Sequence, residues 1–369
     1  MFNLKFTYPI GIDISNHNIY AVQLKQTRQG FVVRCLMNRE LNGEAGGDPY
    51  ASDALVPVFE EISKNKQFLG KRVVAHLPSQ NIFSFPIRFQ VGKAETLEEA
   101  ILRESKEYLP FPLEEAIIDY PSIISPSSSG DNNYKVTIIA VRRDHVKQYL
   151  LMLKQAGLIL EAVDFGISSL IRLHNYLYKT TDNPIILCNI GHTQSPLSIV
   201  TKESILAEPT VPWGIEGLLR KIQANLEFIN DKDKAKILLK KYGLLYEDRE
   251  SSNNSMDLTE DIKTDNISRA IYQIITPLIE ELIYEFHKLI GYVRSEERDV
   301  VFEGIYLYGQ AALIHHLDDY LERRLNIPTK LINPMTKVAL PDENILGDIP
   351  EGAPFALALG LAMRKVPWL

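Results

Sequence analysis

Two strand–turn–strand patterns lie one domain's length apart in the sequence. In residues 8–24, Ile10, Ile12 and Ile14 alternate before a polar turn, and a second apolar run follows it. Residues 185–200 repeat this pattern around the turn 191–195. Asp13 and Asn189 occupy equivalent places, and their separation of 176 residues, the difference between positions 189 and 13, is too long for a solenoid repeat. The chain is therefore predicted to contain a domain-sized duplication.

Strand and helix patterns alternate through both halves, which indicates an α/β fold. Thr96 and Glu99 form a capping-box signature before a helix that ends at Pro110. In the second half, helices are predicted over 215–226 and 267–292. The segment between them, 247–266, is rich in Ser, Asn, Asp and Glu, and we expect it to be a mobile loop.

Composition excludes several classes of protein. A formal net charge of −7 and a pI near 5.7 argue against a nucleic-acid binder, which needs clustered cations. Cys35 and Cys188 both lie in apolar runs, so no disulfide framework is predicted and a reducing compartment fits better. No stretch approaches about 18 uninterrupted apolar residues, so membrane association is expected only through a partner.

The two turns suggest a shared anion site. Consecutive backbone N–H groups in a tight turn can bind phosphate without a lysine. Here Asp13 would hold a hydrated cation, Ser15 to Asn18 would offer amides, and Gly191 to Thr193 would approach from the opposite domain. The alternative, that both turns are ordinary hairpins, stays open.

His17 and His192 lie at equivalent points of the two turns, and histidines in such places usually face solvent. No Walker-type loop, HExxH or nucleophile-elbow motif occurs, which removes the commonest independent enzyme classes.

A long motif carries a family resemblance. The stretch from Glu107 to Glu115, followed by Asp119 and Tyr120, resembles the signature of the PilM family of type IV pilus assembly proteins. The same family order continues at Gly11–Leu24, Ile139–Arg143, Asn189–Ile199, Val211–Glu216, Leu307–Leu317 and Pro354–Arg364. The resemblance thus covers nearly the whole chain.

The resemblance implies a duplicated actin-like (ribonuclease H-like) α/β fold of two lobes. Each lobe would have a mixed five-stranded sheet flanked by helices. Lobe one would span 1–183 with an inserted subdomain at about 85–141, and lobe two 184–369 with an insertion at about 211–298. A cleft between the lobes would bind ATP with Mg²⁺.

The nucleotide-binding residues follow by the same resemblance, and no catalytic residue is assigned. They are Gly11, Asp13, Ser15, Asn16, His17, Asn18, Asn189, Gly191, His192, Thr193, Gly214, Lys236, Lys240, Gly309 and Gln310, with Asp13 contacting Mg²⁺ through water.

Several positions depart from the family pattern. Ser15 replaces a glycine, Tyr20 a lysine, and Asn189 and Pro196 replace aspartates. Loss of a positioned general base costs roughly 10²–10⁴ in rate. On the adenosine side, the family's glycine run is reduced to Gly309. The insertion helix of the family usually pairs a Glu with a Lys; here Ala235 is followed by Lys236, and Leu239 takes the place of the lysine, with Lys240 adjacent. We expect weak ATP binding and at most weak hydrolysis, and a site that binds no nucleotide stays open.

The leading hypothesis is a cytoplasmic adaptor rather than an enzyme. By the resemblance, it would dock the cytoplasmic N-terminal tail of an inner-membrane PilN-like protein in a groove between lobe one and its insertion, and it would contact other pilus or secretion components. It would then be peripheral to the inner membrane through that partner. One alternative is an active ATPase or small-molecule kinase of the same superfamily. Another is a filament-forming protein of the FtsA kind, for which residues 365–369 are too short a membrane helix.

Overall fold

The computed structural model of this 369-residue chain contains two compact units. It describes residues 8–15, 17–41, 52–77, 81–120, 123–124, 133–178, 182–202, 204–226, 229, 231–244, 258–296, 300–340 and 350–365. Unit 1 comprises Met1–Asp182, Ile199–Glu208 and Pro334–Leu369, and unit 2 comprises Asn183–Ser198 and Pro209–Asn333. Each unit is described by itself.

A mixed five-stranded sheet forms the centre of unit 1. Its strands are β1 (Ile10–Ile14), β2 (Asn18–Thr27), β3 (Gly30–Glu40), β4 (Arg72–His76) and β9 (Ile159–Asp164), in the order β3-β2-β1-β4-β9. The pairs β1–β2 and β2–β3 are antiparallel, whereas β4 runs parallel to both β1 and β9. The first turn of the sequence therefore joins two neighbouring antiparallel strands, as predicted.

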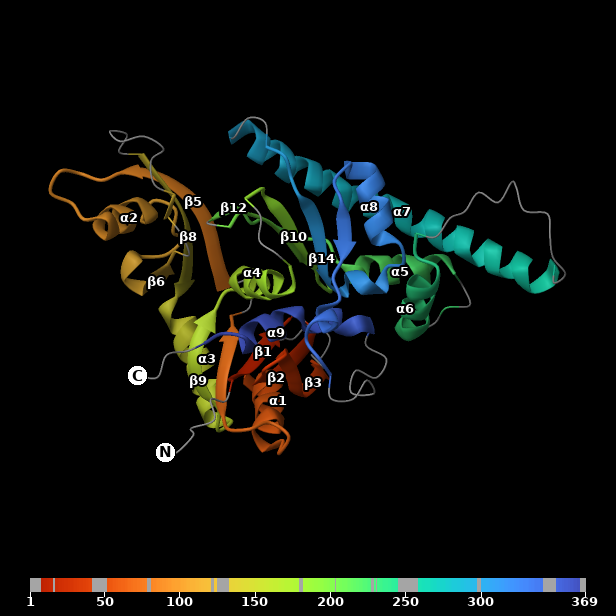
Figure 1. The fold of residues 1–369 in the computed structure, drawn as a ribbon, viewed down its shortest axis with the longest axis horizontal. Helices are drawn as coiled ribbons and strands as arrows, with labels where there is room; N and C mark the ends of the chain where they lie inside the picture. The colour runs from red at the N-terminus through yellow and green to blue at the C-terminus, as the bar shows by residue number, and fades with distance from the viewer. Residues whose placement is uncertain are drawn as a thin grey trace. The chain divides into compact units, whose positions relative to one another are not determined.

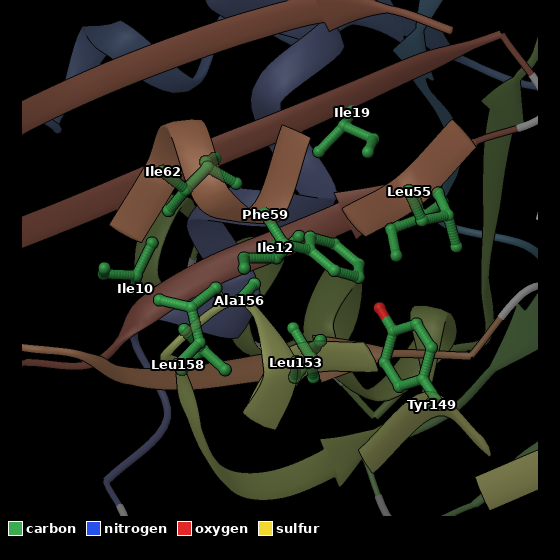
Figure 2. Close-up of a cluster of buried hydrophobic side chains, with 14 of the residues drawn as sticks. Ile10, Ile12, Ile19, Leu55, Phe59, Ile62, Tyr149, Leu153, Ala156 and Leu158 are labelled. Atoms are coloured by element: carbon green, nitrogen blue, oxygen red, sulfur yellow. The ribbon is translucent and has the colours of Figure 1, made fainter. Parts of the chain in front are cut away.

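Two helices cover one face of this sheet. They are α1 (Ser52–Lys64) and α3 (Arg143–Gln155), which pack against each other. Ile10, Ile12 and Ile14 lie in one buried cluster with Phe59 of α1 and Leu153 of α3. Figure 2 shows Phe59 and Leu153 within this cluster, close to Ile12. Burial of these apolar side chains stabilises the position of β1 in the sheet, and therefore that of the first turn, which follows it.

The opposite face carries α4 (Gly166–Leu177) and α9 (Ala356–Ala362). Since side chains alternate along a strand, Gly11 and Asp13 point to this face. The helix α9 packs against β1 and β2 (Figure 1). The last helix was predicted to belong to lobe two, whereas α9 lies in unit 1. The exact lobe boundaries stay a prediction.

The inserted segment of unit 1 forms a second, smaller sheet. It contains β5 (Ile82–Gln90), β6 (Ala116–Asp119), β7 (Ile123–Ile124) and β8 (Asn133–Arg142), in the order β5-β8-β6 with β7 paired to β8. The helix α2 (Leu97–Ser105) packs on β5, and a short 3₁₀ helix, η2 (Leu113–Glu115), precedes β6. The predicted capping box is confirmed, because Thr96 and Glu99 exchange both capping hydrogen bonds. The insertion has its own apolar cluster, which includes Ile87, Ile101 and Ile138.

The sheet of the second half repeats the strand order of the first. Its strands are β10 (Ile185–Ile190), β11 (Ser195–Val200), β12 (Ile205–Ala207), β14 (Gly304–Gly309) and β15 (Thr329–Leu331), in the order β12-β11-β10-β14-β15, with β13 (Thr210–Val211) added beside β11. In both sheets the first strand of the repeat lies between its second and fourth strands. The predicted duplication is thus present in the topology.

Helices follow these strands in unit 2. They are α5 (Ile215–Asn225), α6 (Lys232–Lys241), α7 (Leu258–Glu296) and α8 (Leu317–Leu325), with the 3₁₀ helix η3 (Gln310–Leu313) after β14. The 39-residue α7 starts earlier than predicted, so the expected mobile loop at 247–266 is wrong for 258–266, and its remainder lies outside the described residues. No helix in the described part of the chain is both long and apolar enough to span a membrane.

Candidate nucleotide site

The amides of the first turn are bonded within the turn itself. Ser15 Oγ accepts hydrogen bonds from the Asn18 N–H at 2.9 Å and the His17 N–H at 3.4 Å, and it donates to Asn18 O at 2.9 Å. The Ser15 N–H donates to the same carbonyl at 2.9 Å. Asn16 lies outside the described residues. The turn therefore satisfies internally the N–H groups of Ser15, His17 and Asn18, three of the four that were predicted to bind phosphate.

Asp13 has a buried histidine as its partner. The residue is 4% exposed, and its Oδ1 lies 2.6 Å from Nε2 of His76. The other ring nitrogen, Nδ1, donates to Leu77 O at 2.6 Å. Both neighbours are acceptors, and only the charged imidazolium offers two donors. Burial lowers the pKa of His76, but the hydrogen bond and charge of Asp13 outweigh it, so the pKa lies above its usual 6.5.

Asp13 and His76 belong to a row of charges along one edge of the sheet. The strands β1, β4 and β9 are parallel, and His76 pairs in register with Asp164. Asp164 Oδ2 lies 2.9 Å from Arg172 of α4, and its Oδ1 lies 3.1 Å from Arg364, just after α9. Acids and bases thus alternate at the carboxyl ends of the strands, which is where α/β folds bind ligands.

Gly11 faces a helix. A Cβ at this position would overlap the carbonyl oxygen of Ala358 and would lie 2.5 Å from the Ala362 N. The close approach of α9 to β1 therefore requires glycine at this position. A role for Gly11 in nucleotide binding stays a prediction.

The second turn is equally tight. Ser195 Oγ accepts from the Gly191 N–H at 3.3 Å and donates to Trp213 O at 2.7 Å. A Cβ at Gly214 would lie 2.7 Å from the N of Thr193. Gly214 thus lies directly against the turn that holds His192 and Thr193. Their role in nucleotide binding stays a prediction.

His192 is paired to a buried glutamate. Its Nε2 lies 3.0 Å from Oε2 of Glu216, while Oε1 of Glu216 accepts from Arg220 at 2.7 Å and from Lys232 at 2.9 Å. Burial opposes the charge of Glu216, but these cations keep its pKa below the usual value. The expectation that His192 faces solvent is wrong. His17 is half-buried and lies 2.7 Å from Glu40.

The end of β14 comes close to β10. Gly309 pairs in register with Ile190, and its φ of 67° lies in the left-handed region that favours glycine. A Cβ there would overlap Oδ1 of Asn189 and lie 2.5 Å from Ile190 O. Asn189 and Gly309 are thus neighbours in unit 2, and Gln310 follows as the first residue of η3. A shared role in nucleotide binding stays a prediction.

The two predicted lysines of α6 do not lie on the buried face of that helix. Ala235 and Leu239 are buried, and α6 contacts η3. Lys236 Nζ donates to Asp233 at 3.3 Å, and Lys240 is exposed. This helix therefore presents apolar side chains to η3, and the role of Lys236 and Lys240 in nucleotide binding stays a prediction.

The residues present do not fit a magnesium ion at Asp13. Mg²⁺ demands octahedral oxygen ligands at about 2.0–2.1 Å and usually keeps several waters. Oδ1 of Asp13 is already bonded to His76, and the carboxylate is buried. No group of three or more His, Cys, Asp or Glu side chains within the described ranges could hold a metal ion.

A family model described as type IV pilus assembly protein PilM matches residues 11–366. The chain belongs to the PilM family. Among solved structures it is similar to a PilM-PilN type IV pilus biogenesis complex, with a TM-score of 0.74 and 22% identity over 98% of this chain and 99% of that chain. Ethanolamine utilization protein EutJ from Carboxydothermus hydrogenoformans has a TM-score of 0.51 and 13% identity, over 96% and 89% of the two chains. A MamK double helical filament has a TM-score of 0.50 and 10% identity, over 96% and 97%. The expected family and the duplicated actin-like fold are confirmed.

Proposed function

We propose that this PilM family protein is an adaptor that docks the cytoplasmic N-terminal tail of an inner-membrane PilN-like protein. It would be cytoplasmic, held at the inner membrane through that partner, and would contact other components of a pilus or related secretion machine. The solved complex of PilM with PilN supports this partner. The observation in this chain that carries the proposal is an exposed aromatic surface on the insertion of unit 1.

This tail-docking surface is made of Phe85, Tyr108 and Phe111. Tyr108 is 52% exposed and stacks on Phe85, with ring centroids 5.4 Å apart and an interplanar angle of 15°. Phe111 packs on Phe83 and lies under the Arg142 guanidinium. Exposed apolar groups gathered beside polar ones are typical of sites that bind another protein. Tyr108 has the features of an anchor residue.

Edge strands and charge indicate what kind of segment would bind. In the order β5-β8-β6, both β5 and β6 are outer strands, and an extended tail can add to such an edge by backbone hydrogen bonds. Glu107 and Glu114 are exposed on the segment that carries Tyr108 and Phe111. A tail with apolar side chains and a few lysines or arginines fits this chemistry.

Replacing the exposed tyrosine tests the docking proposal. We expect Tyr108→Ala to raise the Kd for a labelled synthetic peptide of a PilN cytoplasmic tail about 10-fold or more, because aromatic anchors dominate binding energy. The Kd is measured from the fluorescence anisotropy of the labelled peptide as the full chain is added. Tyr284→Ala is the matched control, since Tyr284 of α7 is also exposed, at 63%, but lies in unit 2. Equal affinities for the two variants would reject the tail-docking surface.

The nucleotide site is proposed to be weak, with little or no turnover. The internal hydrogen bonds of Ser15 and the His76 partner of Asp13 support this, since both compete with phosphate and cation. We expect ATP with Mg²⁺ to bind no tighter than the micromolar range and phosphate release to stay at background. Ser15→Gly should bind the nucleotide more tightly, because it frees the two amides that Ser15 Oγ holds. Robust steady-state phosphate release by the wild-type chain would favour the ATPase alternative instead.

A further inference from the structure

His76 lies between two buried acids at the carboxyl edge of the unit 1 sheet. It is 7% exposed, Asp13 is 4% exposed and Asp164 is 5% exposed. Asp13 lies 2.6 Å from the ring, and Asp164 is its register partner on β9. Asp164 is already matched by Arg172 and Arg364. Asp13 has the His76 ring as its ion-pair partner.

A buried carboxylate needs a positive partner, because an uncompensated charge is costly away from water. The residue paired with Asp13 across β1 and β2 is Tyr20, which carries no positive charge and packs edge-on against Phe355 at 5.1 Å. The cation therefore comes from the neighbouring parallel strand, β4. The Leu77 carbonyl fixes the ring from the other side at 2.6 Å, so His76 is oriented by the backbone toward Asp13.

We propose that His76 is a built-in cation that takes the place of a divalent metal ion beside Asp13. With the ring present, this edge of unit 1 takes no divalent cation. Removal of the ring leaves a buried carboxylate and space for water, and a hydrated divalent cation then binds. This inference deepens the proposed lack of turnover, and it does not depend on tail docking.

The test uses Mn²⁺ alone, without nucleotide or tail peptide, on the full chain. Electron paramagnetic resonance of free Mn²⁺ gives the bound fraction for the wild type, His76→Ala and the double variant His76→Ala with Asp13→Asn. We expect His76→Ala to bind one Mn²⁺ about 10-fold or more tighter than the wild type, and the double variant to lose this gain. His316→Ala is the matched control, because His316 also lies 2.6 Å from a carboxylate, Asp319, but at the surface. It should gain nothing.

Two outcomes would overturn the inference. One is equal Mn²⁺ binding by the wild type and His76→Ala, whether strong or absent. The other applies if His76→Ala does not fold: an anomalous Mn²⁺ peak at Asp13 in crystals of the wild-type chain rejects the inference, and an intact Asp13–His76 contact without such a peak supports it. Since neither measurement uses nucleotide or tail, failure here is distinct from failure of the adaptor proposal.

Discussion

Gly11→Ala is expected to lower the free energy of unfolding of unit 1 by about 1–3 kcal/mol or more. The added Cβ would overlap the Ala358 carbonyl and lie 2.5 Å from the Ala362 N. Both atoms belong to the backbone of α9, which cannot move aside as a flexible side chain can. Thermal and urea denaturation of the full chain measure the loss.

Gly291→Ala is the matched control for this prediction. Gly291 lies in α7, and a Cβ there would meet no atom within 4 Å. The change should stabilise the helix by roughly 0.5–1 kcal/mol or have no effect, since alanine favours helix more than glycine does. If Gly11→Ala were as stable as Gly291→Ala, the packing of α9 on β1 would be refuted.

Leu153→Ala should cost about 2–5 kcal/mol, because it removes a fully buried side chain from the cluster that supports β1. The leucine lies among Phe59, Tyr149 and Leu158 (Figure 2). The loss should appear as a lower midpoint of denaturation. The amides of the first turn should also exchange faster with solvent hydrogen than in the wild type.

The same helix provides the control. Leu151 of α3 is 64% exposed, and Leu151→Ala is the same chemical change two residues away. It should shift stability by no more than about 0.5 kcal/mol. Similar losses for both variants would mean that α3 does not bury the face described for it.

The duplicated fold was predictable because its signals are local. Alternating isoleucines and a polar turn fix a hairpin within about 17 residues, and the same pattern recurs near residue 189. The five equivalent strands have the same order in the two sheets, which confirms what that recurrence implied. The Thr96–Glu99 capping box was equally local, and it forms as predicted.

The charged row behind the first turn was not predictable from the sequence. His76 ends a predicted strand, but its contact with Asp13 depends on the parallel pairing of β4 with β1, which joins residues 63 positions apart. The packing of α9 on β1 joins residues that are even farther apart in the sequence, since α9 spans Ala356–Ala362 and β1 spans Ile10–Ile14. No periodicity within a short window carries such information.

The structure bears on two expectations about the turns, one at Ser15 and one at His192. Ser15, which replaces a glycine of the family, was one reason to expect weak ATP binding, and its hydroxyl accepts hydrogen bonds from two amides of the turn. The equivalent place of His192 suggested a solvent-facing side chain, but Glu216 holds it almost buried. That pairing arises because the N-terminus of α5 folds back onto the second turn.

Hydrogen exchange of the full chain, with and without a synthetic PilN cytoplasmic tail, tests the adaptor proposal most directly. We expect the tail to slow exchange in the insertion of unit 1, between Ile82 and Arg142, and above all in β5, β6 and the segment from Glu107 to Glu115. Tyr108→Ala should remove that protection. Protection confined to unit 2, or none at tail concentrations that saturate binding, would contradict the proposal.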